Sequence, residues 1–158
     1  MRKIDIEEVK EYIRNTSNST KIYIGADSER YKKNGVWFAD YTVAIVIHID
    51  GNHGCKVFGT VDTERDYDQK KNRPRTRLMN EVYRASQMYL ELAEAIGDRH
   101  AEVHLDISCD VMNGSSCVMN EAIGYVKGMC NITPKLKPDA FSASYTADRL
   151  KDILSAAA

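Results

Sequence analysis

The chain has 158 residues, 43% of them hydrophobic, which is enough for one globular domain with a substantial core. Its 22 Lys and Arg residues and 23 Asp and Glu residues give a formal net charge of −1, so the total charge does not by itself indicate a nucleic-acid binder. No apolar run is long enough to span a membrane, and no signal-peptide core follows Met1. We therefore expect a soluble, cytoplasmic protein without a membrane partner. The cysteines lack CxxC spacing, which favours reduced structural thiols over a zinc site.

The first third of the chain predicts a helix followed by a three-stranded meander. Ile6, Val9 and Ile13 recur at helical spacing, so residues 1–20 are expected to form an N-terminal helix and turn packed on a domain that spans residues 21–158. Large apolar residues at odd positions, beginning with Trp37, predict a strand with one buried face, and Asn34-Gly35 predicts the turn before it. The three strands are expected at about residues 21–27, 37–49 and 55–61.

The rest of the chain predicts helices alternating with strands. A long helix is expected to begin near Pro74, carry an apolar stripe from Leu78 onward, and end at Gly97. Ser115 and Ser116 are candidate caps for a later helix. The remaining expected elements are a strand at 102–108, a helix to about residue 128, an edge strand at 132–138 and a helix at 140–154. This order predicts one α/β domain with a mixed sheet covered by helices.

Two acidic residues fall on strands that are expected to be buried. Asp27 is expected at the end of the first strand and Asp106 near the end of the fourth. A carboxylate in a buried strand is costly unless it has a partner, a proton or a metal. If a crossover helix makes these strands parallel neighbours, their carboxyl ends meet, and the two acids would share a cation.

Two further acids on helices fit the same site. Glu81 flanks the apolar stripe of the long helix, and Asp148 has a comparable position on the last helix. Taken alone, the first is typical of a surface acid and the second of a local ion pair; Asp110 and Asp139 are alternatives. Four converging carboxylates would require hard cations such as Mg²⁺ or Mn²⁺. Two such ions about 4 Å apart support an in-line phosphoryl displacement by water.

Basic and aromatic residues are candidate contacts for nucleic acid. A basic stretch within residues 70–77 is typical of a solvated loop, and beside a catalytic site it would become a phosphate-contacting rim. The sequence pattern contains no clear aromatic stacking platform. His104 alternates with Asp106, and a packed core histidine is favoured over a proton shuttle.

The order of the elements and of the four acids resembles the ribonuclease H fold. The local sequence is similar to the YkuK family of ribonuclease-H-like proteins over most of the chain from residue 21 to residue 148. The matching segments are residues 22–28, 77–82, 102–107, 124–128 and 137–143, with Ala147-Asp148.

This resemblance implies a mixed five-stranded sheet flanked by helices and a nuclease-type site with two Mg²⁺ or Mn²⁺ ions. By position, the catalytic and metal-binding residues would be Asp27, Glu81, Asp106 and Asp148. The substrate would be DNA, RNA or a hybrid. Two alternatives stay open: a non-catalytic module that binds nucleic acid or protein, and a 3′–5′ exonuclease. The D-x-E start of such exonucleases fits residues 27–29, but their water-positioning Tyr or His does not fit Tyr145.

Overall fold

The structure is a computed structural model, and it describes residues 4–51, 54–68, 74–108 and 118–137. The elements in chain order are α1 (Ile6–Arg14), β1 (Lys21–Lys33), β2 (Val36–His48), the 3-10 helix η1 (Ile49–Gly51), β3 (Cys55–Arg65), α2 (Arg75–Ile96), β4 (His100–Ser108), α3 (Met119–Cys130) and β5 (Lys135–Lys137). This order is the expected one as far as β5. The expected helix at 140–154 and the candidate caps Ser115 and Ser116 lie outside the described residues. Of the helices described, none is long and apolar enough to cross a membrane.

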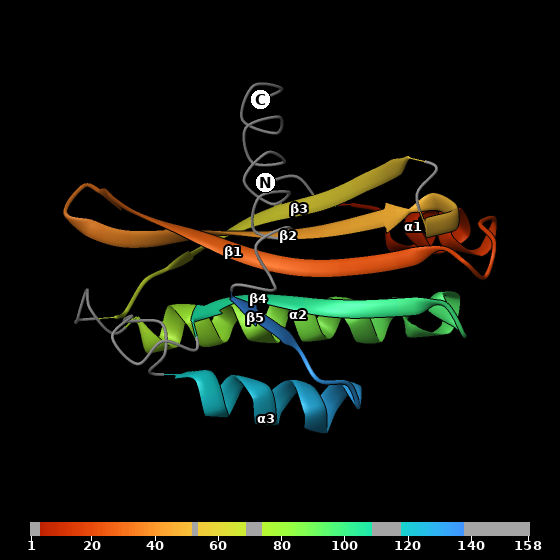
Figure 1. Cartoon of the computed structure of the whole chain (residues 1–158). Coiled ribbons are helices and arrows are strands. Elements are labelled where there is room, and N and C mark those ends of the chain that lie inside the picture. Colours follow the sequence, from red (N-terminus) through yellow and green to blue (C-terminus); the bar gives the residue numbers. More distant parts are fainter. Residues whose placement is uncertain (1–3, 52–53, 69–73, 109–117, 138–158) are drawn as a thin grey trace.

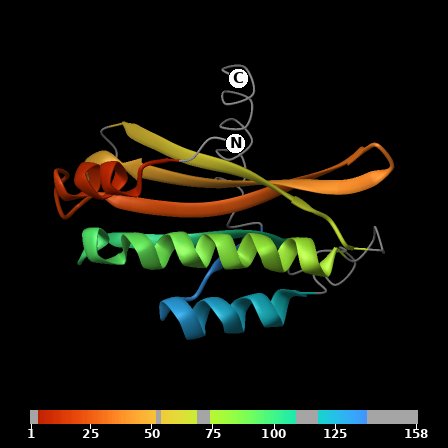
Figure 2. The same ribbon diagram turned by 180° about the vertical axis from the view of Figure 1, so that it is seen from behind.

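The five strands form one mixed sheet in the order β3-β2-β1-β4-β5. β1, β2 and β3 pair antiparallel as a meander, whereas β4 pairs parallel to β1 and β5 pairs parallel to β4. α2 is the crossover helix between β3 and β4, and it lies between the sheet and α3 (Figures 1 and 2). The predicted α/β class with a mixed five-stranded sheet is therefore confirmed.

β1 is longer than the sequence predicts. It was expected to end at Asp27 but continues to Lys33, and it pairs with β2 up to Lys33 and Val36. The turn between them uses Asn34 (φ 51°) and Gly35 (φ 78°), the positive angles that a two-residue hairpin turn requires. Backbone pairing needs no apolar side chains, so the strand persists through a polar stretch. As a result, Asp27 lies inside a strand and not at its end.

The core lies between the sheet and α2. α1 joins the same core through Val9 and Ile13, both completely buried. β2 is buried on both faces, because Thr42, between core residues, is also inaccessible. This differs from the single buried face that was predicted. The residues of the sheet that face α2 include Ile22, Ile24, Val43, Ile45, Ile47, Val103 and Leu105.

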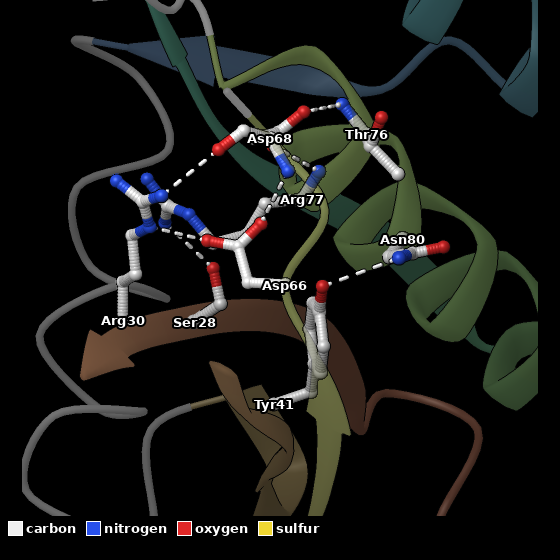
Figure 3. Close-up of polar contacts among 8 residues, drawn as sticks. All are labelled: Ser28, Arg30, Tyr41, Asp66, Asp68, Thr76, Arg77 and Asn80. Carbon is white, nitrogen blue, oxygen red and sulfur yellow. Dashed lines mark hydrogen bonds and ion pairs between the residues drawn. The ribbon is translucent and has the colours of Figure 1, made fainter. Parts of the chain in front are cut away.

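Polar contacts fix α2 against the meander. Arg84 donates two hydrogen bonds to the carboxylate of Asp62 on β3, at 3.1 and 2.8 Å, and its guanidinium lies 3.9 Å from the ring centre of Tyr41 on β2. Asn80 donates a hydrogen bond to the Tyr41 hydroxyl at 3.2 Å (Figure 3). Charge-assisted bidentate contacts of this kind set orientation as well as energy. These contacts of Arg84 and Asn80 fix the rotation of α2 about its axis. In this rotation Glu81, the residue after Asn80, points toward the sheet.

Candidate functional site

Asp27 and Asp106 lie side by side where the pairing of β1 with β4 stops. The last paired residues are Ala26 and Leu105, and the next residue on each strand is the aspartate. Neighbouring strands are about 4.8 Å apart, and residues at the same register position point to the same face of the sheet. The prediction that β1 and β4 are parallel neighbours is confirmed, and it gives this pair of acids a common location.

The aspartate pair carries an electrostatic cost that cations reduce. Like charges on adjacent positions of neighbouring strands are destabilising. Lys137 of β5 forms an ion pair with Asp106 through its ammonium group. Lys137 therefore places a positive charge directly on the candidate site.

Glu81 is a buried acid coupled to this pair. Its side chain is only 3% exposed, although it was expected at the margin of the apolar stripe. Burial raises the pKa of Glu81 well above its ordinary value of 4.5, and the negative charge of Asp27 raises this pKa further, with a smaller contribution from Asp106. Three of the four predicted acids therefore influence one another in the described part of the chain.

Ser28 and Arg77 complete the surroundings of Glu81. The Ser28 hydroxyl donates a hydrogen bond to Oε1 of Glu81. It accepts a hydrogen bond from Nη1 of Arg77 at 2.8 Å (Figure 3). The serine bond and the nearby guanidinium both lower the pKa of Glu81, and so offset part of the effect of burial. These two residues stabilise an ionised Glu81 when it forms. Ser28 was not predicted as a site residue, and Arg77 was predicted only as part of the basic stretch.

The fourth predicted acid, Asp148, lies outside the described residues, as do the alternatives Asp110 and Asp139. Within the described ranges no group of three or more His, Cys, Asp or Glu side chains is already arranged to hold a metal ion. The described part of the site is therefore the aspartate pair with Glu81 beside it.

A family model described as ribonuclease H-like matches residues 5–152. The chain belongs to the ribonuclease H-like family. The resemblance found in the sequence is thereby confirmed at the level of this family. Searches of the curated proteins and of the solved structures gave no match.

Ribonuclease H-like proteins often use divalent metal ions, and the donors present fit such ions. Carboxylate oxygens are the ligands that Mg²⁺ and Mn²⁺ prefer. Glu81 is held by Ser28 at the β1 side of α2, and the aspartates each follow the last residue pair of β1 and β4. Burial and, after it, the negative charges of Asp27 and Asp106 raise the pKa of Glu81, and a divalent cation would neutralise these charges.

The members of the basic stretch of this ribonuclease H-like chain have different surroundings. Arg75 forms an ion pair with Glu121 of α3, which favours a structural surface contact for Arg75. Arg77 is half-buried beside the acids and is the member that fits a phosphate-contacting rim. The other members, Lys70, Lys71 and Arg73, lie outside the described residues.

His104 is a packed residue, as expected. Its ring is buried, Nε2 lies 2.9 Å from Oε2 of Glu102, and Tyr23 contacts it edge-on with ring centres 5.4 Å apart. Burial alone would raise the pKa of Glu102, but hydrogen bonds from His104 and His100 to its carboxylate outweigh burial and lower this pKa. These contacts support a structural role for His104.

Asp68 caps α2 from outside the helix. Pro74 at the N-cap position has no side chain that can bond to the helix. The Asp68 carboxylate instead accepts hydrogen bonds from the backbone N–H of Thr76 at 3.0 Å and of Arg77 at 2.9 Å (Figure 3). An acid here also interacts favourably with the helix dipole. Asp68 thus positions the turn of α2 that carries Arg77.

We expect Asp68→Ala to lower the free energy of unfolding by about 0.5–2 kcal/mol, because two N–H groups at the start of α2 lose their acceptor. Asp68→Asn is the matched control, since it keeps an oxygen acceptor and is expected to retain most of the stability. Urea denaturation followed by circular dichroism measures both. Equal loss in the two variants would show that charge, and not capping, explains the contribution of Asp68.

Proposed function

We propose that this protein hydrolyses nucleic-acid phosphodiesters with the help of bound divalent cations. The observation that carries the proposal is the position of Asp27 and Asp106, each directly after the last residue pair of β1 and β4, with Glu81 buried and exposed to the negative charge of both. A buried acid whose pKa is raised by burial and by two nearby aspartates is costly, which supports a functional role for these acids. Membership of the ribonuclease H-like family supports a nuclease in general terms.

Each acid has a proposed role toward the ions. Asp27 would bridge two Mg²⁺ or Mn²⁺ ions, Asp106 and Glu81 would hold one of them, and Asp148 would hold the other. The chemistry that two such ions supply when bound is activation of the attacking water and stabilisation of the leaving oxygen. Glu81 must lose its proton to act as a ligand, so cation affinity is expected to rise with pH.

The residues around the acids would bind and orient the substrate. The Arg77 guanidinium lies next to Glu81 and fits bidentate contact with a phosphate. Its hydrogen bond to Ser28 fixes the approach of the guanidinium, and the cap from Asp68 fixes the backbone behind it. Positioning of the phosphate by such groups accounts for a large part of catalysis in phosphoryl transfer.

The test is a cleavage assay on end-labelled single-stranded DNA, single-stranded RNA, duplex DNA and RNA–DNA hybrid. Each substrate is incubated with Mn²⁺, Mg²⁺ or excess EDTA. Cleavage of at least one substrate with a divalent ion, and of none with EDTA, is the expected result. Absence of cleavage from every substrate at saturating Mn²⁺ would overturn the proposal. Circular substrates, and the order in which labelled fragments appear, distinguish an endonuclease from the alternative 3′–5′ exonuclease.

The second candidate is a non-catalytic member that binds nucleic acid or protein. One contact favours it: the Lys137 ammonium already supplies a positive charge to Asp106. In this reading the lysine permanently replaces a metal ion. In the nuclease reading, the lysine competes with the ion and moves away when the ion binds.

We expect Lys137→Met to increase Mn²⁺ affinity about 2- to 5-fold, because removal of a partly exposed ion pair of under about 1 kcal/mol frees Asp106 for the ion. Lys135→Met on the same strand is the control and is expected to leave the affinity unchanged. Isothermal titration calorimetry at pH 7 measures both. No Mn²⁺ binding by either the parent or Lys137→Met would favour the non-catalytic member.

A further inference from the structure

A second feature of the molecule is a pocket at the far end of the β1–β2 hairpin. It has a volume of about 360 Å³, and its walls include two aromatic side chains, Trp37 of β2 and Tyr67, which follows β3. Arg30 and Arg65 also line it. A volume of this size is within the range of small-molecule sites. None of the roles proposed above for the acids uses this pocket.

Both aromatic rings are accessible. Trp37 is 39% exposed, although its odd position in β2 predicted burial, and Tyr67 is 67% exposed. Each ring has a guanidinium close to it: Arg30 lies 4.1 Å from the Trp37 ring centre and Arg65 lies 5.1 Å from the Tyr67 ring centre. Large exposed aromatic residues in one pocket are typical of binding sites and not of a free surface. The two rings are candidates for the aromatic stacking platform that the sequence pattern does not show.

The pocket is held in shape by a connected set of polar contacts. The backbone N–H of Asp66 donates to the Trp37 carbonyl at 2.9 Å, which joins the two aromatic segments. Arg30 forms an ion pair with Asp66 at 2.5 Å and donates a hydrogen bond to the Asp68 carbonyl at 2.9 Å (Figure 3). Because these residues hold one another, the rings are expected to need little reorganisation on binding.

The charges of the pocket favour an anionic aromatic ligand. The Asp66 carboxylate is compensated by Arg30, and the Asp68 carboxylate by the N-terminus of α2. Among the described residues, no acid forms an ion pair with Arg65. Arg65 therefore has its charge available for a phosphate next to a stacked ring.

We propose that this pocket binds an unpaired nucleobase of the nucleic-acid strand, stacked against Trp37 or Tyr67, with its phosphate near Arg65. This inference rests on the proposed function for the choice of nucleic acid as the ligand. Arg30 follows Asp27 by three residues on β1, or about 10 Å. The pocket would hold a base a few nucleotides away from the phosphodiester at the acids.

The experiment uses the fluorescence of Trp37, which is the single tryptophan of the chain. The full chain carrying Asp27→Asn is titrated in EDTA with a short single-stranded oligonucleotide, with an abasic oligonucleotide of equal length and with polyphosphate. Saturable quenching by the oligonucleotide, and at least tenfold weaker binding of the abasic chain and of polyphosphate, is the expected result. Equal binding of all three, or no saturable quenching, would overturn the pocket as a base site.

A substitution tests the stacking partner separately. Tyr67→Ala is expected to weaken oligonucleotide binding about 5- to 150-fold, as the loss of one base–aromatic stack does elsewhere. Tyr83→Ala, which removes an exposed tyrosine of α2, is the control and is expected to bind as the parent does. Circular dichroism verifies that each variant is folded. Unchanged binding by folded Tyr67→Ala would remove Tyr67 from the site.

The two proposals fail in different ways. Because the titration is done without a metal ion and in an Asp27→Asn chain, quenching does not depend on cleavage. Base-dependent quenching without cleavage by the parent protein would support the pocket and overturn the nuclease. Cleavage by the parent without base-dependent quenching would overturn the pocket alone.

Discussion

Asp27→Asn is expected to reduce the rate of metal-dependent cleavage by at least about 100-fold, the scale reported for loss of one preorganised electrostatic group in an active site. The substitution keeps the size and shape of the side chain and removes one negative charge. Asp27 and Asp106 each follow the last residue pair of β1 and β4, so replacing either aspartate by asparagine removes one of the two carboxylates that would hold the cations. Asp106→Asn is therefore expected to have a similar effect. The cleavage rates of the parent and of both variants are measured with end-labelled substrates in Mn²⁺.

The matched control is Asp98→Asn, which changes the same chemical group at an exposed position between α2 and β4. It is expected to cleave at the parental rate. All the variants are purified in the same way, so a contaminating nuclease would give equal rates in every sample. Cleavage by Asp27→Asn at the rate of the parent would remove Asp27 from the mechanism.

Glu81→Gln is expected to make the metal-free protein more stable while weakening its affinity for Mn²⁺. In the parent at neutral pH, a buried carboxyl with a raised pKa must either remain protonated or carry a charge near two other acids. Glutamine removes this charge and still offers Ser28 an oxygen acceptor. An increase of about 1–2 kcal/mol in the free energy of unfolding is typical of a favourable single substitution. Urea denaturation in EDTA measures it.

The pH dependence of this effect has a definite sign. The pKa of Glu81 is higher in the folded protein than its ordinary value of 4.5, so the folded state binds the proton more tightly. The stability that Glu81 contributes is complete below about pH 4.5 and is lost as the pH rises through the raised pKa. The stability advantage of Glu81→Gln over the parent should therefore increase with pH.

Glu91→Gln is the control, because Glu91 is exposed on the same helix and accepts a hydrogen bond only from Gln87 among the described residues. It is expected to change stability by less than about 0.5 kcal/mol at each pH. A Glu81→Gln protein less stable than the parent at pH 8 would contradict the assignment of Glu81 as a strained, functional acid.

Much of the fold could be predicted because hydrophobic periodicity and turn residues specify it locally. The apolar stripe from Leu78 to Ile96 gave α2, and Asn34-Gly35 gave the hairpin turn. The length of β1 could not be predicted in this way, since residues 28–33 are polar and are held by pairing with β2. The exposure of Trp37 was missed for a related reason. The alternation of residues in a strand predicts the face of the sheet on which a side chain lies, but it does not predict where the helix that covers that face begins.

The candidate site was predictable where it depends on strand order. The proximity of Asp27 and Asp106 could be predicted because a crossover helix makes β1 and β4 parallel neighbours. Ser28 and its contact with Arg77 were missed because this hydrogen bond joins positions 49 residues apart. Asp68 was missed because it caps α2 from eight residues before Thr76. The signals available were modest: Ser28 directly follows Asp27, and Arg77 precedes Glu81 by one helical turn. Asp148 remains a prediction from the resemblance.

The most direct measurement is the anomalous scattering of a crystal soaked in Mn²⁺. The account predicts a peak next to the carboxylates of Asp27 and Asp106, at the distance of about 2.1–2.2 Å expected for an ion of this kind bound by oxygen, with Glu81 as a further ligand and the Lys137 ammonium displaced from Asp106. A crystal of the Asp27→Asn variant soaked in the same way should lack the peak. If a crystal soaked in saturating Mn²⁺ shows no peak at the aspartate pair, and Lys137 still contacts Asp106, the result would contradict the account.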